Sequence, residues 1–526
     1  MANSASNAAI GLLKLPTEIH DNVICYLDKA SLKSLRTTCS NLKEIVPFSI
    51  DRVFISANSL NIKVFLAIAD SEIYRHTVSE IIWDDARLST GPESSVERNR
   101  FWYSGDADDI VTDNGCPLWF KARREDSEEP GWDNRGGPKI NSLDLEMSWD
   151  YYKDLLKDQR QILESNADIV AFKHGLRRFL NLKRVTVTPS THGRIGTPMY
   201  RTPMIRAFPA RFDYPLPKEW PHFANDNMEN DEYPWVTDDT IPVGDNECYW
   251  MYKCSPEEYR AKWRGFRVVL RALVECAQDH NVTEFRVGGN EVLTGINCRL
   301  FDQRSQEYDD LVTLLQRPGF RRVDLDLFTG FIENHNISWV SFRSGLLREA
   351  LAQAKNLRHV TLRTTTDIAE GEAGQIYGGD LPEKTFPLRT IFPIDQWPNL
   401  QHFGISNMLV TQRDLIPFLA ALPKSLRSVE LSHLAWADTD DDYQGLLESI
   451  RTKLDWCMRP AGQRPKVHMK VSPLGICLDQ GRYVEIDDMV HFFLYEDGEN
   501  PFKNGGDGIN WGDGGVERDF FDPDIA

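Results

Sequence analysis

The chain has 526 residues, of which 41% are hydrophobic and 26% are charged, and its formal net charge is -19. This length suits two or more domains or one elongated array. No stretch approaches the run of about eighteen apolar residues that a membrane span needs. A chain this acidic repels phosphate backbones unless basic groups cluster on one face, and its basic doublets form no such stripe. We therefore expect neither membrane insertion nor nucleic-acid binding.

The cysteines and the first residues favour a reducing compartment. The nine cysteines are an odd number and are widely scattered. Cys248 and Cys254 form the closest pair, without the matching second pair of a zinc site. Residues 1–16 lack the basic region and apolar core of a secretory signal. We expect reduced thiols, no bound metal, and a location in the cytoplasm, the nucleus or both.

The first segment with a readable pattern runs from residue 13 to residue 47. Pro16 suits the first turn of a helix, where its missing N–H costs nothing. Ile19, Val23 and Leu27 recur at four-residue spacing and make an apolar stripe on one face of that helix.

Two more short helices should follow this first one. Ser31 is a good N-cap for the second, and Ser40 or Asn41 for the third. Three helices in about 35 residues cannot bury all their apolar groups among themselves. The remaining apolar face therefore needs a partner, either another chain or the rest of this one.

This segment resembles the F-box. The positions that agree in order and spacing are Leu15, Pro16, Glu18, Ile19, Ile24, Tyr26, Leu27, Ser31, Leu32, Leu35, Arg36, Cys39 and Leu42. The resemblance implies docking on the Skp adaptor of a cullin-based ubiquitin ligase. The adaptor-binding residues that it implies are Leu15, Pro16, Glu18, Ile19, Ile24, Leu27, Leu32, Leu35, Cys39 and Leu42. The alternative is an ordinary cap of amphipathic helices at the start of the chain.

A helix followed by a short strand of the form Leu-x-x-Val-x-Leu then recurs along the chain. The expected strands are residues 78–84, 182–188, 282–288, 320–326, 357–363, 400–406, 426–432 and 467–472. Such recurrence is typical of a solenoid, whose units must stack because none closes a core alone. We predict one mostly parallel sheet in sequence order, with helices on its convex side.

The recurring unit resembles a degenerate leucine-rich repeat. Leu400, Phe403, Ile405, Asn407 and Leu409 approach that consensus, but the other units mostly lack the asparagine. Their spacing of roughly 26 to 43 residues exceeds the usual length of about 20–29. The chain as a whole resembles the F-box proteins of filamentous fungi. The alternative is a set of unrelated units in a globular α/β domain.

We therefore predict the α/β class: a three-helix F-box at residues 11–50 and an irregular, leucine-rich-repeat-like solenoid at residues 51–495. Two insertions, at about residues 87–150 and 189–260, interrupt the early units. They contain half of the fourteen tryptophans, whereas disordered linkers are poor in aromatics. We expect the insertions to fold onto the repeat surface, and residues 496–526 to form a frayed acidic tail rich in Gly and Asp.

No catalytic motif stands out. The sequence lacks a phosphate loop, a nucleophile elbow and a helical His pair with a glutamate. Acidic pairs such as Asp84-Asp85 and Asp487-Asp488 are expected on solvated faces. No cofactor is implied, and a ligase subunit needs no catalytic group because it holds its target near an activated ubiquitin.

Strand alternation identifies candidate residues for binding a target. The Val and Leu positions face the core, so their neighbours face the concave side of the sheet. The candidates on that side are Arg184, Arg286, Arg322, His359, Arg363 and His402. Their signs are mixed with those of nearby acids, so the sequence does not predict the converging arginines of a phosphate site. From the second insertion, Trp220, Trp235 and Trp250 are candidate aromatic anchors.

The leading hypothesis is the substrate-recognition subunit of a Skp–cullin–F-box ubiquitin ligase. Its partners would be a Skp-type adaptor, a cullin through that adaptor, and an unknown protein substrate. A second hypothesis is a scaffold that binds the adaptor outside any cullin ligase. A third is an enzyme that carries an F-box.

Overall fold

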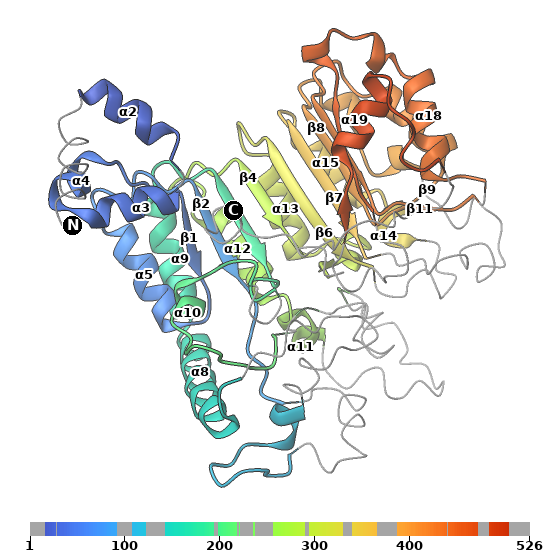
Figure 1. Cartoon of the computed structure of the whole chain (residues 1–526). Helices are drawn as coiled ribbons and strands as arrows, with labels where there is room; N and C mark the ends of the chain where they lie inside the picture. Colours follow the sequence, from blue (N-terminus) through green and yellow to red (C-terminus); the bar gives the residue numbers. More distant parts are fainter. Residues whose placement is uncertain are drawn as a thin grey trace, which may run out of the picture.

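A computed structural model of the chain defines its architecture (Figure 1). The structure describes residues 16–27, 29–91, 108–122, 142–193, 198–217, 220, 235–236, 256–289, 294–329, 339–365, 387–438, 440–471 and 483–503. Three short helices come first, and a long α/β region built around one sheet follows them.

Within the described residues, the main sheet has nine parallel strands that lie side by side in sequence order. They are β1 (Arg52–Ile55), β2 (Glu80–Asp84), β3 (Arg184–Thr188), β4 (Glu284–Val287), β6 (Arg322–Phe328), β7 (His359–Thr364), β8 (His402–Ser406), β10 (Ser428–Ser432) and β12 (Lys466–His468). The prediction of a mostly parallel sheet in sequence order is confirmed. Sequence reasoning missed only β1, the four-residue edge strand. The short β5 (Ile296–Asn297) pairs with β6 beside this order.

Helices cover one face of the sheet and follow the order of the strands. They are α5 (Ser59–Ala69), α9 (Ala167–Arg178), α12 (Arg264–Glu275), α13 (Gln306–Leu315), α15 (Leu346–Ala352), α17 (Gln412–Ala420), α18 (Tyr443–Lys453) and α19 (Asp487–Tyr495). From α5 to α15, each helix contacts the next, and α17, α18 and α19 do the same at the other end. A strand, a crossover helix and the next parallel strand are thus the repeating unit. Membership of the leucine-rich repeats stays a prediction.

Smaller elements decorate this frame. The helices are α8 (Leu145–Ser165), α10 (Pro203–Arg206), α11 (Pro256–Ala261) and α14 (Val340–Arg343). Short 3₁₀ turns occupy Cys298–Phe301, Leu388–Thr390, Ile394–Gln396, Asp455–Met458 and Ala461–Gln463. Two small sheets pair β9 (Leu409–Val410) with β11 (Ala435–Trp436), and β13 (Lys470–Val471) with β14 (Val484–Glu485). Only the start of α8, residues 145–150, falls within the predicted first insertion at about residues 87–150.

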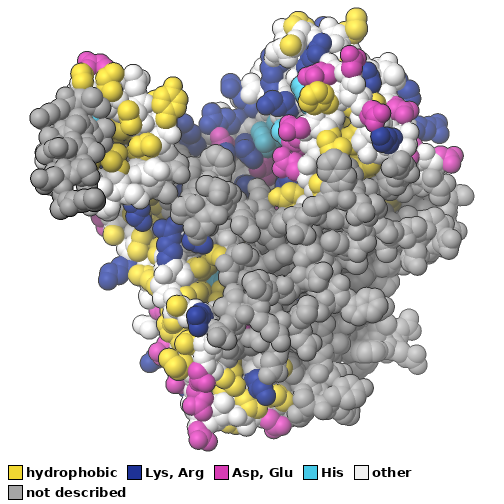
Figure 2. Space-filling view, viewed as in Figure 1, with side chains coloured by type: hydrophobic (Ala, Val, Ile, Leu, Met, Phe, Trp, Pro, Cys, Tyr) yellow, Lys and Arg dark blue, Asp and Glu magenta, His cyan; other side chains and the backbone are white. Residues whose placement is uncertain are grey.

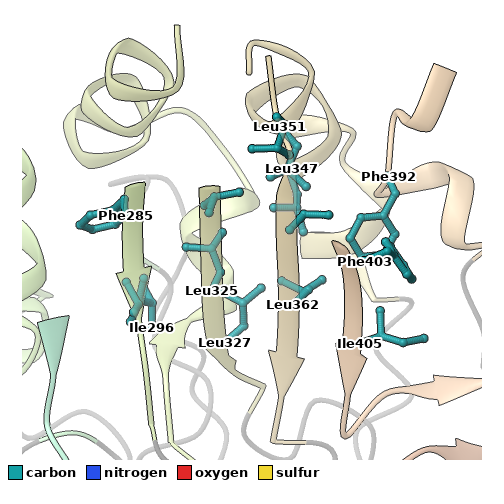
Figure 3. Packing of buried hydrophobic residues seen from close by; sticks show 14 of the residues in the cluster. Phe285, Ile296, Leu325, Leu327, Leu347, Leu351, Leu362, Phe392, Phe403 and Ile405 are labelled. Atoms are coloured by element: carbon teal, nitrogen blue, oxygen red, sulfur yellow. The ribbon is translucent and has the colours of Figure 1, made fainter. Parts of the chain in front are cut away.

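The core lies between the sheet and its helices, and strand alternation explains its composition. In β6, Val323, Leu325 and Leu327 are buried, and in the neighbouring strands Leu362 and Ile405 occupy the same layer. Figure 3 shows Leu325, Leu327, Leu362 and Ile405 in one packed cluster with Leu347, Leu351 and Phe392. Because side chains alternate between faces, the residues between them point to the opposite, polar face.

The tryptophans of the predicted insertions are buried wherever the structure describes them. Trp119 and Trp149 belong to a separate aromatic cluster with Phe120 and Tyr152. Trp220 and Trp235 belong to the main core. The expectation that these segments fold onto the α/β region holds for Trp220 and Trp235. Trp102, Trp132 and Trp250 lie outside the described residues.

Two expectations about acidic segments were wrong. Asp84 and Asp85 are buried rather than solvated, because β2 ends beneath the second insertion and the Trp220 indole N–H donates to Asp85 Oδ2 (2.8 Å). The start of the predicted tail is also packed. Phe502 is buried and its ring stacks on Tyr443 of α18. Residues 504–526 lie outside the described residues.

Candidate functional site

The three N-terminal helices expose apolar side chains. They are α2 (Thr17–Cys25), α3 (Lys29–Thr38) and α4 (Ser40–Ile45), and Figure 1 shows them beside the β1 edge of the sheet. Ile19 is 43% exposed, Tyr26 is 88% exposed, and Val23 and Ile45 are also exposed. Leu42 and Val46 are buried. The helices therefore keep part of their apolar surface open, as their small size requires.

Among the described residues, a series of side-chain contacts links these helices to the α/β region. The Arg36 guanidinium donates to the Val46 carbonyl oxygen and lies over the Phe48 ring. Phe48 in turn meets Tyr74 edge to face, with ring centroids 6.4 Å apart. These contacts fix the place where the helices leave the sheet.

The helix starts differ from the predicted ones. Ser31 lies inside α3 rather than before it, because that helix already begins at Lys29. Cys39 is the N-cap residue of α4 and makes no side-chain cap hydrogen bond, so neither Ser40 nor Asn41 serves as the cap. Pro16 precedes α2, also without such a bond.

The second candidate site is a cavity of about 260 Å³ on the polar face of the sheet. Its lining residues come from β4, β6, β7, β8, β10 and the segment from β12 to α19: Arg286, Arg322, Asp324, Asp326, His359, Thr361, Arg363, His402, Glu430, Ser432, His468, Met469, Lys470, Glu485 and Asp487. Figure 2 shows histidine and charged side chains in a hollow between the N-terminal helices and the C-terminal units. The polar face is thus concave here.

Asp324 is the electrostatic centre of the cavity wall. Arg322 donates two hydrogen bonds to its Oδ2 (2.9 and 2.7 Å), and Arg286 Nε lies 3.8 Å from the same atom. His359 Nε2 is 3.1 Å from Oδ1. Burial raises the pKa of Asp324, but these neighbours outweigh burial and hold that pKa well below its ordinary value. Asp324 is therefore a carboxylate at any physiological pH.

Two histidine rings stack beside this carboxylate. His359 and His402 occupy paired positions of β7 and β8, and their ring centroids are 4.0 Å apart with an interplanar angle of 10°. Burial lowers the pKa of both, and the pKa of His402 falls to about 2 with a further contribution from His359. Ser428 Oγ lies 2.7 Å from His402 Nδ1. The pair is therefore neutral at physiological pH.

Two further charge pairs line the cavity. Arg363 donates to Glu430 (3.1 Å), reaching from β7 over β8 to β10. His468 Nδ1 lies 2.5 Å from Asp487 Oδ2, and this hydrogen bond raises the pKa of His468. Asp487 also accepts the Met469 N–H (2.8 Å), so it fastens the start of α19 to the sheet. Within the described residues, no group of His, Cys, Asp and Glu is arranged to hold a metal ion.

Comparison with protein families identifies the N-terminal helices. Residues 12–48 match the family model of the F-box domain. The chain is an F-box protein. No curated protein matches its sequence. An F-box implies binding of a Skp-type adaptor and a role in SCF-type ligases, and F-box proteins are generally non-catalytic. None of the described helices is long and apolar enough to cross a membrane.

The F-box positions that the sequence predicted for adaptor binding differ in exposure. Pro16, Glu18, Ile19 and Cys39 are exposed, and the partly exposed set is Ile24, Leu27, Leu32 and Leu35. Leu42 is buried, so it holds α4 in place instead of offering surface. Leu15 lies outside the described residues. The role of all these positions in binding stays a prediction.

The structure brings most of the predicted target-binding residues of this F-box protein together. Arg286, Arg322, His359, Arg363 and His402 all line the one cavity. Arg184 lies outside it, on β3, where it pairs with Glu284 (2.7 Å). Strand alternation predicted that these residues share one face of the sheet, but not that they line a single cavity, because their strands are tens of residues apart.

The tryptophan anchors do not fit the structure. Trp220 and Trp235 are fully buried, and each indole N–H donates to a carboxylate, of Asp85 and Glu307 respectively. An aromatic ring can anchor a target only if it is exposed, so Trp220 and Trp235 do not belong to the target-binding surface. Trp250 lies outside the described residues.

Sequence reasoning missed the wall formed by His468, Lys470, Glu485 and Asp487. His468 and Lys470 do alternate along the last predicted strand, which was the available signal. Glu485 and Asp487 come from a later segment that only the fold places here. Gly404 was also missed; at this position of the polar row a Cβ would crowd Thr361 and His402, which line the cavity.

Proposed function

We propose that this F-box protein is the substrate-recognition subunit of a Skp–cullin ubiquitin ligase in the cytoplasm, the nucleus or both. The adaptor docks on the F-box and the target docks on the concave face of the sheet. A cullin is reached through the adaptor. The protein itself supplies no catalytic group: it raises the effective concentration of its target near the activated ubiquitin.

The observation that carries this proposal is the separation of two surfaces of different chemistry. The F-box offers Ile19, Val23 and Tyr26, which are exposed and apolar. Docking of a partner protein would remove this apolar area from water. The cavity offers charged and polar groups that are held by one another and by the sheet. Such a site confers specificity more than affinity.

The proposal is tested by co-purification from cells. Ile19→Asp, or the double change Leu15→Ala with Pro16→Ala, should abolish recovery of the adaptor and cullin, because a charge or a missing contact disrupts the apolar surface. Val170→Asp is the matched control, since Val170 is exposed on α9, which is not part of the F-box. Retained adaptor binding by Ile19→Asp would contradict the assignment of this surface.

The cullin separates the two leading hypotheses. A ligase subunit should recover cullin in the same fraction as adaptor, and both should disappear together in the Ile19→Asp variant. Recovery of the adaptor without cullin would instead support a scaffold that acts outside the ligase.

A further inference from the structure

A glycine lies beneath two of the side chains that line the cavity. Gly404 is paired with Thr361 on one side and Glu430 on the other, in the polar row of the sheet. A Cβ at this position would lie 3.0 Å from Thr361 Oγ1 and 3.2 Å from His402 Nε2. A glycine inside a strand weakens the strand, and it often marks a close approach by another group. Here it leaves room for the Thr361 and His402 side chains, which close over it and line the cavity.

The size of the cavity limits what it can hold. Its volume of about 260 Å³ is below the range of about 300–1,000 Å³ that small-molecule sites occupy. A folded peptide segment does not fit into that space, whereas a single side chain does. The occupant is therefore one residue of a target, placed against Thr361 and His402.

The charges that line the cavity balance. The cations are Arg286, Arg322, Arg363 and Lys470, and the anions are Asp324, Asp326, Glu430, Glu485 and Asp487. His468 completes the cationic side, because Asp487 stabilises its imidazolium form. Unlike the whole chain, with its net charge of -19, this surface is close to neutral.

The contacts pair these charges internally. Arg322 is hydrogen-bonded to Asp324, Arg363 to Glu430, and His468 to Asp487. A phosphate would have to compete with these carboxylates for the guanidinium groups and would lie among five negative charges. Phosphate sites instead direct arginines at the ligand. A cationic target side chain would have to compete with the arginines for the carboxylates. Without such a partner it would be a buried unpaired charge, which is costly.

We propose, on the basis of the function proposed above, that the cavity receives one uncharged target side chain that both donates and accepts hydrogen bonds. A carboxamide of Gln or Asn is the simplest such group. The guanidinium N–H groups of Arg322 and Arg363 lie along the wall as donors, and the carboxylates of Asp324 and Glu430 as acceptors. The target is thus recognised without phosphorylation at this position.

The proposal is tested by NMR titration of the full chain, labelled in its histidine side chains. The probes are the N-acetyl methylamides of glutamine, glutamate and lysine, and inorganic phosphate. The glutamine probe should shift the His359 and His402 resonances in a saturable manner. It should bind about tenfold more tightly than each of the other three, because only it leaves the internal pairs intact. Tighter binding of phosphate, or no saturable shift with the glutamine probe, overturns the proposal.

Two variants locate the binding. Gly404→Val suits a strand, but its Cβ would lie 3.0–3.2 Å from Thr361 and His402 and would push both side chains into the cavity, so the glutamine probe should no longer shift either histidine. Thr361→Val keeps the shape and removes a hydroxyl, and should weaken the probe by about threefold to tenfold. Arg184→Gln is the matched control, on the same face but outside the cavity. Undiminished binding by folded Gly404→Val would place the probe elsewhere and refute the site. The order in which the unsubstituted chain binds the four probes tests the proposal even if a variant fails to fold.

The result of the titration does not depend on whether the ligase assignment is correct. Loss of the ligase assignment would appear as failure of adaptor recovery with the unsubstituted chain. The glutamine probe would still bind in that case. Failure of the cavity proposal would appear in the titration while adaptor recovery continues.

Discussion

The F-box helices and the α/β region use apolar residues in opposite ways. In the F-box, Ile19 and Tyr26 remain exposed, whereas in the sheet Val323, Leu325 and Leu362 are at most 1% exposed. The difference is one of geometry. Three short helices have no layer to pack against, whereas each strand of the sheet is covered by a helix and flanked by further strands. The same residue types therefore form a docking surface in one region and a core in the other.

Truncation of one residue in each region should separate these roles most strongly. Leu362→Ala should lower the free energy of unfolding by about 2–5 kcal/mol, since it leaves a cavity in a closed core. Ile19→Ala should change it by less than about 0.5 kcal/mol in the isolated chain. Urea unfolding of both variants measures the difference, and equal losses would show that the F-box surface is closed by contacts within the chain.

The buried carboxyl group of Asp84 should impose a pH dependence that belongs to the α/β region alone. Burial raises the pKa of Asp84 to about 7, whereas the unfolded chain has its ordinary value of about 3.9. Between these values the folded chain binds the extra proton, so stability falls as pH rises through this window. Asp84→Asn should remove that slope and stabilise the chain above pH 7, by on the order of 4 kcal/mol at most.

Thermal unfolding of the unsubstituted chain and Asp84→Asn at pH 5 and pH 8 measures this effect. Asp158→Asn is a control, because Asp158 lies on the neighbouring α8, where it accepts hydrogen bonds from Asn58 and Ser59. A gain for Asp84→Asn that is the same at both pH values would show that the carboxyl group does not titrate in this range.

Helix capping should also distinguish the two regions. Asn58 caps α5 by accepting hydrogen bonds from the N–H groups of Leu60 and Asn61, whereas Cys39 before α4 makes no such bond. Asn58→Ala should therefore cost about 1 kcal/mol in the free energy of unfolding, and Cys39→Ala close to nothing. Chemical denaturation measures both. A comparable cost at Cys39 would mean that the F-box helix depends on a contact of its own.

The smallest expected effect on stability concerns the hydrogen bond between His468 and Asp487 at the start of α19. Because Asp487 raises the pKa of His468 above its unfolded value, the stabilisation is full below about pH 6.5 and is lost as pH rises through the folded pKa. The pair is partly exposed, so the effect should stay below about 1 kcal/mol. His468→Gln should flatten the change in stability between pH 6 and pH 8, measured by urea unfolding. An unchanged slope would exclude this pair as its source.

The eight predicted strands and their order could be derived from the sequence, because a Leu-x-x-Val-x-Leu pattern has the period of a strand with one buried face. The F-box was also readable, since its positions are local and close together. The same alternation indicated which side chains share the polar face. β1 carried too few residues for any period to stand out, and α8, most of which follows the predicted first insertion, was not predicted.

The tertiary structure alone decided which polar residues meet. Arg286 and Asp487 are two hundred residues apart, and only parallel pairing followed by the return of α19 places both beside one cavity. It also determined that Trp220 and Trp235 are buried, whereas the sequence could not distinguish them from exposed anchors. Deleting residues 189–260 would thus remove core side chains and would not test target binding alone. Whether a residue is buried depends on the segments that pack over it. In this chain those segments are far apart in the sequence, so a local pattern does not reveal them.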